Sequence, residues 1–127
     1  MEAKLIFDQS DKQITVYQMD FGFTQYTDDT GKPSGYPTGG TINMVVESTN
    51  DTQLIDWMLE PNALKNGKIE IQMKNKKVIK FENAYCVQYH ESFNYQGGDQ
   101  PMTISFTISA ETITVDSKPF TTKRKTT

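Results

Sequence analysis

Cys86 and His90 are the side chains whose chemistry and spacing come closest to a nucleophile and its base. A thiol becomes an activated nucleophile when an imidazole lies within hydrogen-bond reach. The two residues are four positions apart in a segment with strand-like alternation, so both would point to the same side of a strand, about 13 Å from each other. A proton is not shared over that distance, and we expect both side chains to have structural roles.

The other residue patterns that could bind a metal or a phosphate are incomplete. His90 is the only histidine, which excludes a zinc site of the His-Glu-x-x-His kind. Gly31 and Lys32 lack the glycine five positions earlier that a phosphate-binding loop requires. Asp28, Asp29 and Gly31 resemble a fragment of a calcium-binding loop without its other ligands. No pair among the 16 acidic residues has an apolar setting suited to acid–base catalysis. We therefore predict a protein that is not an enzyme and has no catalytic residue, cofactor or metal.

Residues 102–110 alternate strictly between apolar side chains and small hydroxyls, which predicts a strand with two different faces. The apolar face carries Met102, Ile104, Phe106, Ile108 and Ala110. The other face carries Thr103, Ser105, Thr107 and Ser109. A row of uncharged hydroxyls suits a surface that meets both water and other protein, although an ordinary exposed sheet face of high β-propensity has the same pattern. The run indicates assembly without proving it.

The composition narrows the classes of function. The 127 residues suffice for one domain with a sizeable core. Thirteen basic and 16 acidic residues give a net charge of −3, without the basic excess of a nucleic-acid-binding protein. One cysteine excludes an internal disulfide, and neither a signal peptide nor a bilayer-spanning run is recognisable. We expect folding in the cytoplasm, no nucleic-acid partner and no membrane insertion.

The hydropathy pattern predicts a mainly β chain. Strands are expected at residues 5–7, 14–23, 41–48, 68–74 and 78–90, and from residue 102 through a change of phase between Ala110 and Ile113. The apolar residues also change phase near Val16, which predicts a β-bulge. Residues 75–76 are expected to form a two-residue hairpin turn. The side chains expected on one face of the strand at 78–90 are Ile79, Phe81, Tyr85, Val87 and Tyr89.

One helix is expected, at residues 51–60. Asn50 would cap its first turn, and Gln53, three residues later, would complete a capping box. Pro61 ends the helix, because the residue before a proline leaves the α region. A helix of this length is not stable alone in water, so it must dock on the sheet. The residues expected to anchor it in the core are Leu54, Trp57 and Met58.

Two segments lack the alternation of a strand. Residues 24–40 contain four glycines and two prolines, which exclude regular structure over this long loop. We interpret it as a loop that becomes ordered against a partner, in preference to one that is merely mobile. Residues 116–127 carry four basic residues and one acidic residue. We expect them to form a flexible basic tail behind a domain of residues 1–115.

Several short segments together resemble the Hcp (haemolysin-coregulated protein) family of type VI secretion tube proteins, and most closely its short, compact branch. The segments are residues 20–23, 31–35, 39–42, 46–49, 56–58, 81–87 and 102–111. Each is a weak signal alone. Their order and spacing extend over residues 5–115, which makes the joint match specific.

The resemblance implies a small two-sheet β-barrel with one flanking helix and a long extended loop. It implies that six copies close into a ring with a wide lumen, and that rings stack into a tube wrapped by a contractile sheath and capped by a spike protein. Sheath contraction would drive the tube, with effector proteins in its lumen, out of the cell through the type VI apparatus. The subunit itself would be structural, and cytoplasmic until secretion.

Two sets of residues are expected to serve this assembly. The ring-stacking loop would include Asp28, Asp29, Gly31, Lys32, Pro33, Ser34, Gly35, Tyr36 and Pro37. The hydroxyl row on residues 103–109 would face either the lumen or a seam between subunits. Two other functions stay open: a tail-tube protein of a phage-like particle, and a carbohydrate- or ligand-binding β-domain that uses its tyrosines. An enzyme with paired carboxylates in a cleft comes third.

Overall fold

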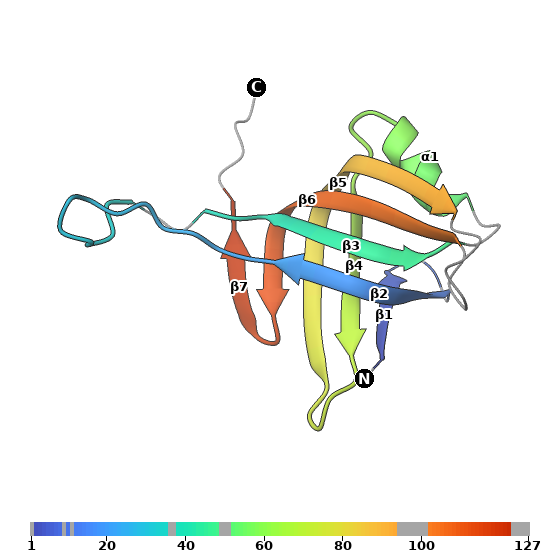
Figure 1. Ribbon diagram of the computed structural model, residues 1–127, viewed down its shortest axis with the longest axis horizontal. Coiled ribbons are helices and arrows are strands. Elements are labelled where there is room, and N and C mark those ends of the chain that lie inside the picture. The colour runs from blue at the N-terminus through green and yellow to red at the C-terminus, as the bar shows by residue number, and fades with distance from the viewer. Residues whose placement is uncertain are drawn as a thin grey trace.

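Antiparallel strands close into a barrel in the computed structural model of the chain (Figure 1). The structure describes residues 2–8, 10, 12–35, 38–48, 52–93 and 102–122. The strands are β1 (Ala3–Phe7), β2 (Gln13–Phe21), β3 (Thr41–Glu47), β4 (Lys65–Ile71), β5 (Lys77–Phe93), β6 (Met102–Val115) and β7 (Lys118–Thr121). The helix α1 (Gln53–Leu59) follows β3 in the chain. The expected mainly β barrel with one short helix is therefore confirmed.

The strand that closes the barrel is β6. The strands are hydrogen-bonded in the order β3-β2-β1-β4-β5-β6-β7, and β6 also pairs with β3. Its pairing with β3 covers residues 103–109, and its pairing with β7 covers residues 112–115. β1 to β6 therefore surround the core, and β7 extends the sheet past the start of β3.

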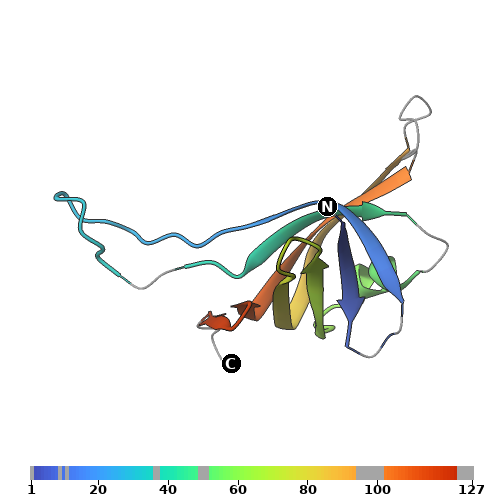
Figure 2. The same ribbon diagram turned by 90° about the horizontal axis from the view of Figure 1, so that it is seen from below.

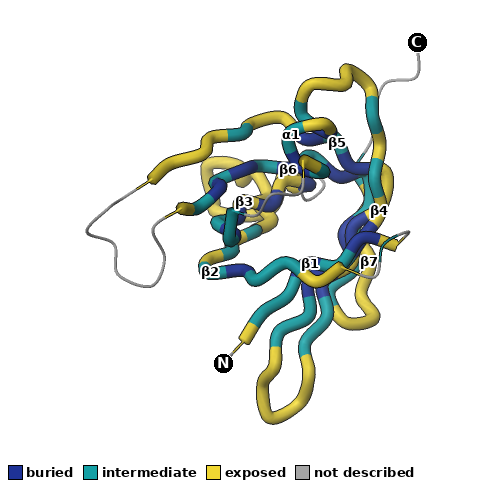
Figure 3. The backbone as a smooth tube through the Cα atoms, turned by 90° about the vertical axis from the view of Figure 1, so that its right-hand side faces the viewer, coloured by how far each residue is buried: buried dark blue, intermediate teal, exposed yellow. Residues whose placement is uncertain are grey.

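Apolar side chains fill the inside of this barrel. Figure 3 shows which parts of the backbone carry the buried residues. The largest fully buried side chains are Leu5, Ile42, Val46, Ile69, Ile79, Phe81, Ile108 and Ile113. They come from β1, β3, β4, β5 and β6, so burial of apolar surface depends on all these strands at once. Exposed residues gather in the connections between elements (Figure 3).

The helix is shorter than expected and starts differently. It begins at Gln53, with Thr52 as its N-cap residue and no side-chain cap, so Gln53 cannot be the third residue of a capping box. Asn50 and Asp51 lie outside the described residues. The helix ends at Leu59, two residues before Pro61, as the proline predicts. The core anchor is confirmed: Leu54 and Trp57 are buried, and Met58 packs against the core half-buried.

Both predicted changes in the phase of the apolar alternation, one in β2 and one in β6, are confirmed. In β2 the register against β3 shifts between Val16 and Gln18, where the bulge was expected. In β6 both Ala110 and Ile113 are buried, although three positions separate them.

A corner in β5 was not foreseen. The buried residues of this strand are Ile79, Phe81, Ala84 and Cys86. The prediction that Tyr85 and Val87 share the inward face is therefore wrong. Between the two buried pairs lies Asn83, which has a φ of +52° and donates from its side-chain amide to Oε1 of Glu111 at 3.0 Å. β5 and β6 change phase together at this point, so both strands keep their apolar side chains in the core.

Two connections also differ from the sequence prediction. β4 begins at Lys65 and ends at Ile71, so residues 72–76, not two residues, join it to β5. Within the segment expected to be a flexible tail, residues 118–121 form β7, which pairs with residues 112–115 of β6. The half of β6 left unpaired by β3 provides the edge for this strand. Residues 123–127 lie outside the described residues, and their flexibility stays a prediction.

Candidate assembly surfaces

Residues 24–35 and 38–40 form an arm that projects from one end of the barrel, beyond the end of β2 and the start of β3 (Figures 1 and 2). Thr24 and Thr38 exchange backbone hydrogen bonds of 2.8 and 2.6 Å at the base of the arm. A second bridge joins Thr27 and Pro33 near its tip. The prediction that glycines and prolines exclude all regular structure is corrected at these two bridges. The pairing satisfies backbone groups that would otherwise depend on water alone.

A turn closed by Asp28 forms the tip of the arm. Its Oδ1 atom accepts hydrogen bonds from the hydroxyl of Thr30 (2.7 Å), the N–H of Thr30 (2.9 Å) and the N–H of Lys32 (3.1 Å). These bonds, that of the Thr30 hydroxyl foremost, hold the pKa of Asp28 below its ordinary value. Gly31 completes the turn at a φ of +84°, a conformation that glycine adopts without strain. The carboxylate therefore shapes the turn.

The arm exposes the described residues that were expected to stack rings. These are Asp28, Asp29, Gly31, Lys32, Pro33, Ser34 and Gly35. Tyr36 and Pro37 lie outside the described residues. The arm also presents Tyr26, whose side chain is 70% exposed and which the sequence prediction left out. An exposed aromatic residue on a projecting arm is a contact suited to protein interfaces.

The hydroxyl row on β6 belongs to a wider polar face on the outside of the barrel. Thr103, Ser105, Thr107 and Ser109 are half-buried. They alternate with Ile104, Phe106, Ile108 and Ala110, which are buried inside. β5 pairs with β6 on one side of the row and β3 on the other, with β2 beyond β3. Four strands therefore contribute to this face.

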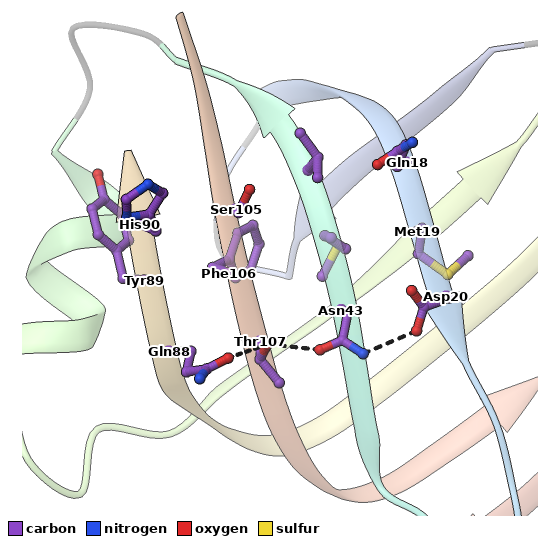
Figure 4. A pocket seen from close by; sticks show the side chains of 12 residues that line it. Gln18, Met19, Asp20, Asn43, Gln88, Tyr89, His90, Ser105, Phe106 and Thr107 are labelled. Atoms are coloured by element: carbon purple, nitrogen blue, oxygen red, sulfur yellow. Dashed lines mark hydrogen bonds between the residues drawn. The ribbon is translucent and has the colours of Figure 1, made fainter. Parts of the chain in front are cut away.

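A chain of polar contacts crosses the face from β5 to β2 (Figure 4). The Thr107 hydroxyl lies 3.3 Å from Oε1 of Gln88 and 2.7 Å from Oδ1 of Asn43. The side-chain amide of Asn43 donates to Asp20 at 2.9 Å. A shallow depression of about 380 Å³ lies over these residues. The sequence prediction found Thr107 but missed the other three residues of this chain of contacts, because neighbours across strands depend on register and not on spacing along the chain.

The face of β5 that turns away from the hydroxyl row has an acidic side chain near the end of the strand, since Glu91 lies opposite the buried Ile104. Glu91 accepts a hydrogen bond from the Ser48 hydroxyl through Oε2 and one from the Tyr89 hydroxyl, at 3.0 Å, through Oε1. Burial, and then the neighbouring Glu91, raise the pKa of Tyr89 to about 12. The Tyr89 hydroxyl therefore stays protonated and donates at any physiological pH.

Cys86 and His90 lie on opposite faces of β5. The register against β6 shifts between Cys86 and Gln88, and the extra residue reverses the alternation beyond it. Cys86 is buried opposite Ile108, whereas His90 is exposed opposite Ser105. The prediction that both point to the same side is wrong. Burial raises the pKa of the Cys86 thiol to about 11, which disfavours the nucleophilic thiolate.

Within the described ranges of the chain, no cluster of three or more His, Cys, Asp or Glu residues could hold a metal ion. None of the helices in those ranges is both long and apolar enough to cross a membrane.

The comparisons with known proteins agree with this architecture. A family model described as "Hemolysin coregulated protein Hcp (TssD)" matches residues 1–123. The chain belongs to the Hcp family. The match includes β7, so the family extends past residue 115, where the sequence resemblance stopped. Hcp proteins are structural tube proteins of type VI secretion systems, which is the class expected from the sequence.

Solved Hcp structures share the fold. Hcp1 from Flavobacterium johnsoniae is 31% identical, with 96% of this chain and 100% of that chain covered and a TM-score of 0.87. Hcp1 from Salmonella typhimurium is 14% identical, with coverages of 94% and 91% and a TM-score of 0.68. A chain of the six-fold symmetrised baseplate of the anti-feeding prophage is 10% identical, with coverages of 91% and 91% and a TM-score of 0.54. A search of the curated proteins found no match.

Proposed function

We propose that this Hcp protein forms hexameric rings that stack into the inner tube of a type VI secretion system. The observation that carries the proposal is the combination of a projecting arm, a polar outer face and two unpaired strand edges on one small barrel. The Hcp1 relative at 31% identity supports the tube role, and the six-fold symmetrised baseplate with a similar fold supports the number of copies.

Two half-strands leave edges on either side of the polar face. β1 pairs with β2 only over residues 13–15, and β4 pairs with β5 only over residues 77–84. Within the described part of the chain, residues 16–21 and 88–93 thus have a strand partner on one side only. Unpaired edges pair readily with other chains. Pairing the β2 edge of one copy with the β5 edge of the next is a head-to-tail contact, which closes into a ring at a suitable rotation.

This pairing would make the polar face continuous around the ring. The hydroxyl row on β6, with its neighbours on β3, β2 and β5, would then line the lumen, and the edges of β2 and β5 would form the seams. Half-buried hydroxyls and exposed amides that already bond one another present few unsatisfied groups to a passing polypeptide. Such a surface is suited to transient contact with effector proteins during export.

The arm would then connect one ring to the next. It projects along the long axis of the molecule, away from the barrel (Figure 1). Sheath, spike and effectors would be the further partners, and the protein would leave the cytoplasm through the secretion apparatus. A tail-tube role in a phage-like particle shares this architecture and is the second candidate, favoured by the prophage baseplate match.

Native mass spectrometry tests the ring. We expect a species of six times 14.5 kDa. A folded protein that stays a lone subunit at every concentration contradicts the proposal.

Shortening the arm tests stacking. Replacing residues 27–33 by Asn-Gly, a two-residue hairpin turn, should leave hexamers intact and abolish long tubes in electron micrographs. Met73→Asp, at a 48% exposed position in the β4–β5 connection, is the control and should not affect tubes. Tubes of normal length from the shortened protein would show that the arm does not join rings.

Cysteine labelling tests the orientation of the polar face. Thr107→Cys should react with a small maleimide in assembled tubes but only slowly with a maleimide that carries a long polyethylene glycol chain, because a tube can be entered only at its two ends and the bulky chain diffuses slowly along the lumen. Lys74→Cys, in the exposed β4–β5 connection, should react with both reagents. The buried Cys86 adds little background. Equal reaction of Thr107→Cys with both reagents contradicts a lumen position.

A further inference from the structure

Three aromatic rings join the arm to the barrel. Phe21 ends β2, Phe23 lies between β2 and the arm, and Phe120 lies on β7. The rings of Phe21 and Phe23 meet edge to face at 6.0 Å, and those of Phe23 and Phe120 are tilted at 4.7 Å. The segment that leads from β2 into the arm therefore packs on β7, which lies beside the base of the arm in Figure 1.

The segment that leads from the arm back into β3 lies close to Phe23 and to Thr122, which follows β7. A Cβ on Gly39 would lie 2.6 Å from Cδ1 of Phe23. A Cβ on Gly40 would lie 2.6 Å from Cγ2 of Thr122, and the φ of Gly40 is +105°. The Gly40 carbonyl accepts from the N–H of Ala110 at 2.6 Å. Two glycines thus allow the backbone to approach the Phe23 ring and Thr122 more closely than other residues could.

Thr122 is itself held in place. Its N–H donates to the carbonyl of Glu111 at 2.8 Å, and its hydroxyl lies 3.3 Å from the same oxygen. β7 and Thr122 therefore lie along the second half of β6, and they contact the base of the arm there. Phe120 thus contacts the segment that enters the arm, at Phe23, and Thr122 contacts the segment that leaves it, at Gly40.

We propose that β7 and Thr122 are a positioning clamp that sets the direction of the arm. The arm is a lever, since about eight residues on each side at about 3.3 Å per residue give a reach of about 26 Å. A tilt of about 10° at the base would move the tip by about 4.5 Å, more than a hydrogen bond tolerates. The clamp therefore decides whether the tip meets its contact on the next copy. The importance of the clamp for ring stacking rests on the proposed function, whereas its effect on the direction of the arm is independent of that function.

Hydrogen exchange at the arm base tests the clamp directly. Phe120→Ala should speed exchange of the Thr24 and Thr38 amides, which bond each other's carbonyls, by roughly 2- to 10-fold, the range expected for an aromatic pair. Exchange of the Val45 amide, in the middle of β3, should not change. Tyr26→Ala, on the arm but with its side chain 70% exposed, is the matched control and should leave both base amides unchanged.

A double-mutant cycle keeps the test decisive if one variant is poorly folded. Phe23→Ala should speed exchange of the same two amides. Adding Phe120→Ala to this variant should have no further effect, because Phe23→Ala already removes the ring contact that Phe120→Ala removes. Unchanged exchange in Phe120→Ala, or additive effects in the double variant, overturns the proposal.

Electron microscopy separates the clamp from the stacking function. If the clamp acts as proposed in assembly, Phe120→Ala rings should form at wild-type yield and give tubes that are fewer and shorter. If wild-type protein forms no tubes, the proposed function fails while the exchange result still stands. Faster exchange with wild-type tubes would limit the clamp to the free subunit and overturn its role in assembly.

Discussion

Replacing Trp57 by alanine removes the side chain that fixes α1 to the barrel. The indole is 2% exposed, meets Phe7 edge to face at 5.6 Å and lies 6.4 Å from Phe106. Its Nε1–H donates to the carbonyl of Ala63 at 3.0 Å, which also fixes the connection after the helix. The helix has seven residues and no side-chain cap, so it has little stability of its own.

The cost follows from these contacts. Burial of a tryptophan removes about 150–250 Å² from water, equivalent to about 4–6 kcal/mol at about 25 cal/mol per Å². Measured tryptophan-to-alanine changes in cores cost about 3–5 kcal/mol, and we expect Trp57→Ala to fall in this range. Trp57→Phe keeps part of the ring contact but loses the hydrogen bond, and should cost about 1–2 kcal/mol. Either loss is a large share of a typical stability of about 5–15 kcal/mol.

Urea unfolding followed by far-ultraviolet circular dichroism measures these costs without relying on tryptophan fluorescence. Protein concentration must be held constant, since the proposed assembly would stabilise the folded subunit by mass action. Leu59→Ala on the same helix is the control: this side chain is 70% exposed, and its loss should cost less than about 0.5 kcal/mol. If Trp57→Ala costs no more than Leu59→Ala, the helix is not anchored through its indole and the argument is wrong.

Three further predictions concern single sites. At pH 8 the Cys86 thiol should react with iodoacetamide about 100-fold more slowly in folded protein than in urea, because folding raises its pKa from 9.0 to about 11. The free energy of unfolding should accordingly fall as the pH rises from about 9 to about 11. Equal reaction rates in folded and unfolded protein would contradict burial of the thiol. The chemical shift of the Lys32 amide should titrate with a midpoint below the ordinary aspartate pKa of 3.8, because this amide donates to Asp28. The Asp28 turn is then intact above the midpoint and loosens below it. Asp28→Ala should remove the titration. Gly67→Ala should cost about 1–3 kcal/mol in thermal unfolding, because its Cβ would lie 2.7 Å from the Phe81 ring and 2.8 Å from a carbonyl, while Gly22→Ala, with open space around it, should be neutral.

Local patterns in the sequence predicted much of the secondary structure. The end of the helix before Pro61 and the bulge at Val16 were found because proline geometry and a change of apolar phase act within a few residues. The alternation on β6 was found for the same reason. The Hcp resemblance rested on such local segments and was confirmed by a family match over residues 1–123.

Features that depend on pairing were missed. β7 has four residues and no apolar alternation, and it exists because β6 offers an edge that β3 leaves unpaired. The opposite orientations of Cys86 and His90 follow from a bulge whose position is set by the register against β6. The contact of Phe23 with Phe120 joins residues almost a hundred positions apart, and no spacing rule indicates it.

The amino-acid sequence alone therefore determined most of the strands, the end of the helix and which face of β6 enters the core. These properties follow from side-chain chemistry and backbone preference over a few neighbouring residues. Tertiary structure alone decided where barrel corners fall, which polar residues meet across strands and what holds the arm. Those outcomes depend on strand register and barrel closure, which are fixed only when distant segments compete for the same hydrogen bonds and the same core.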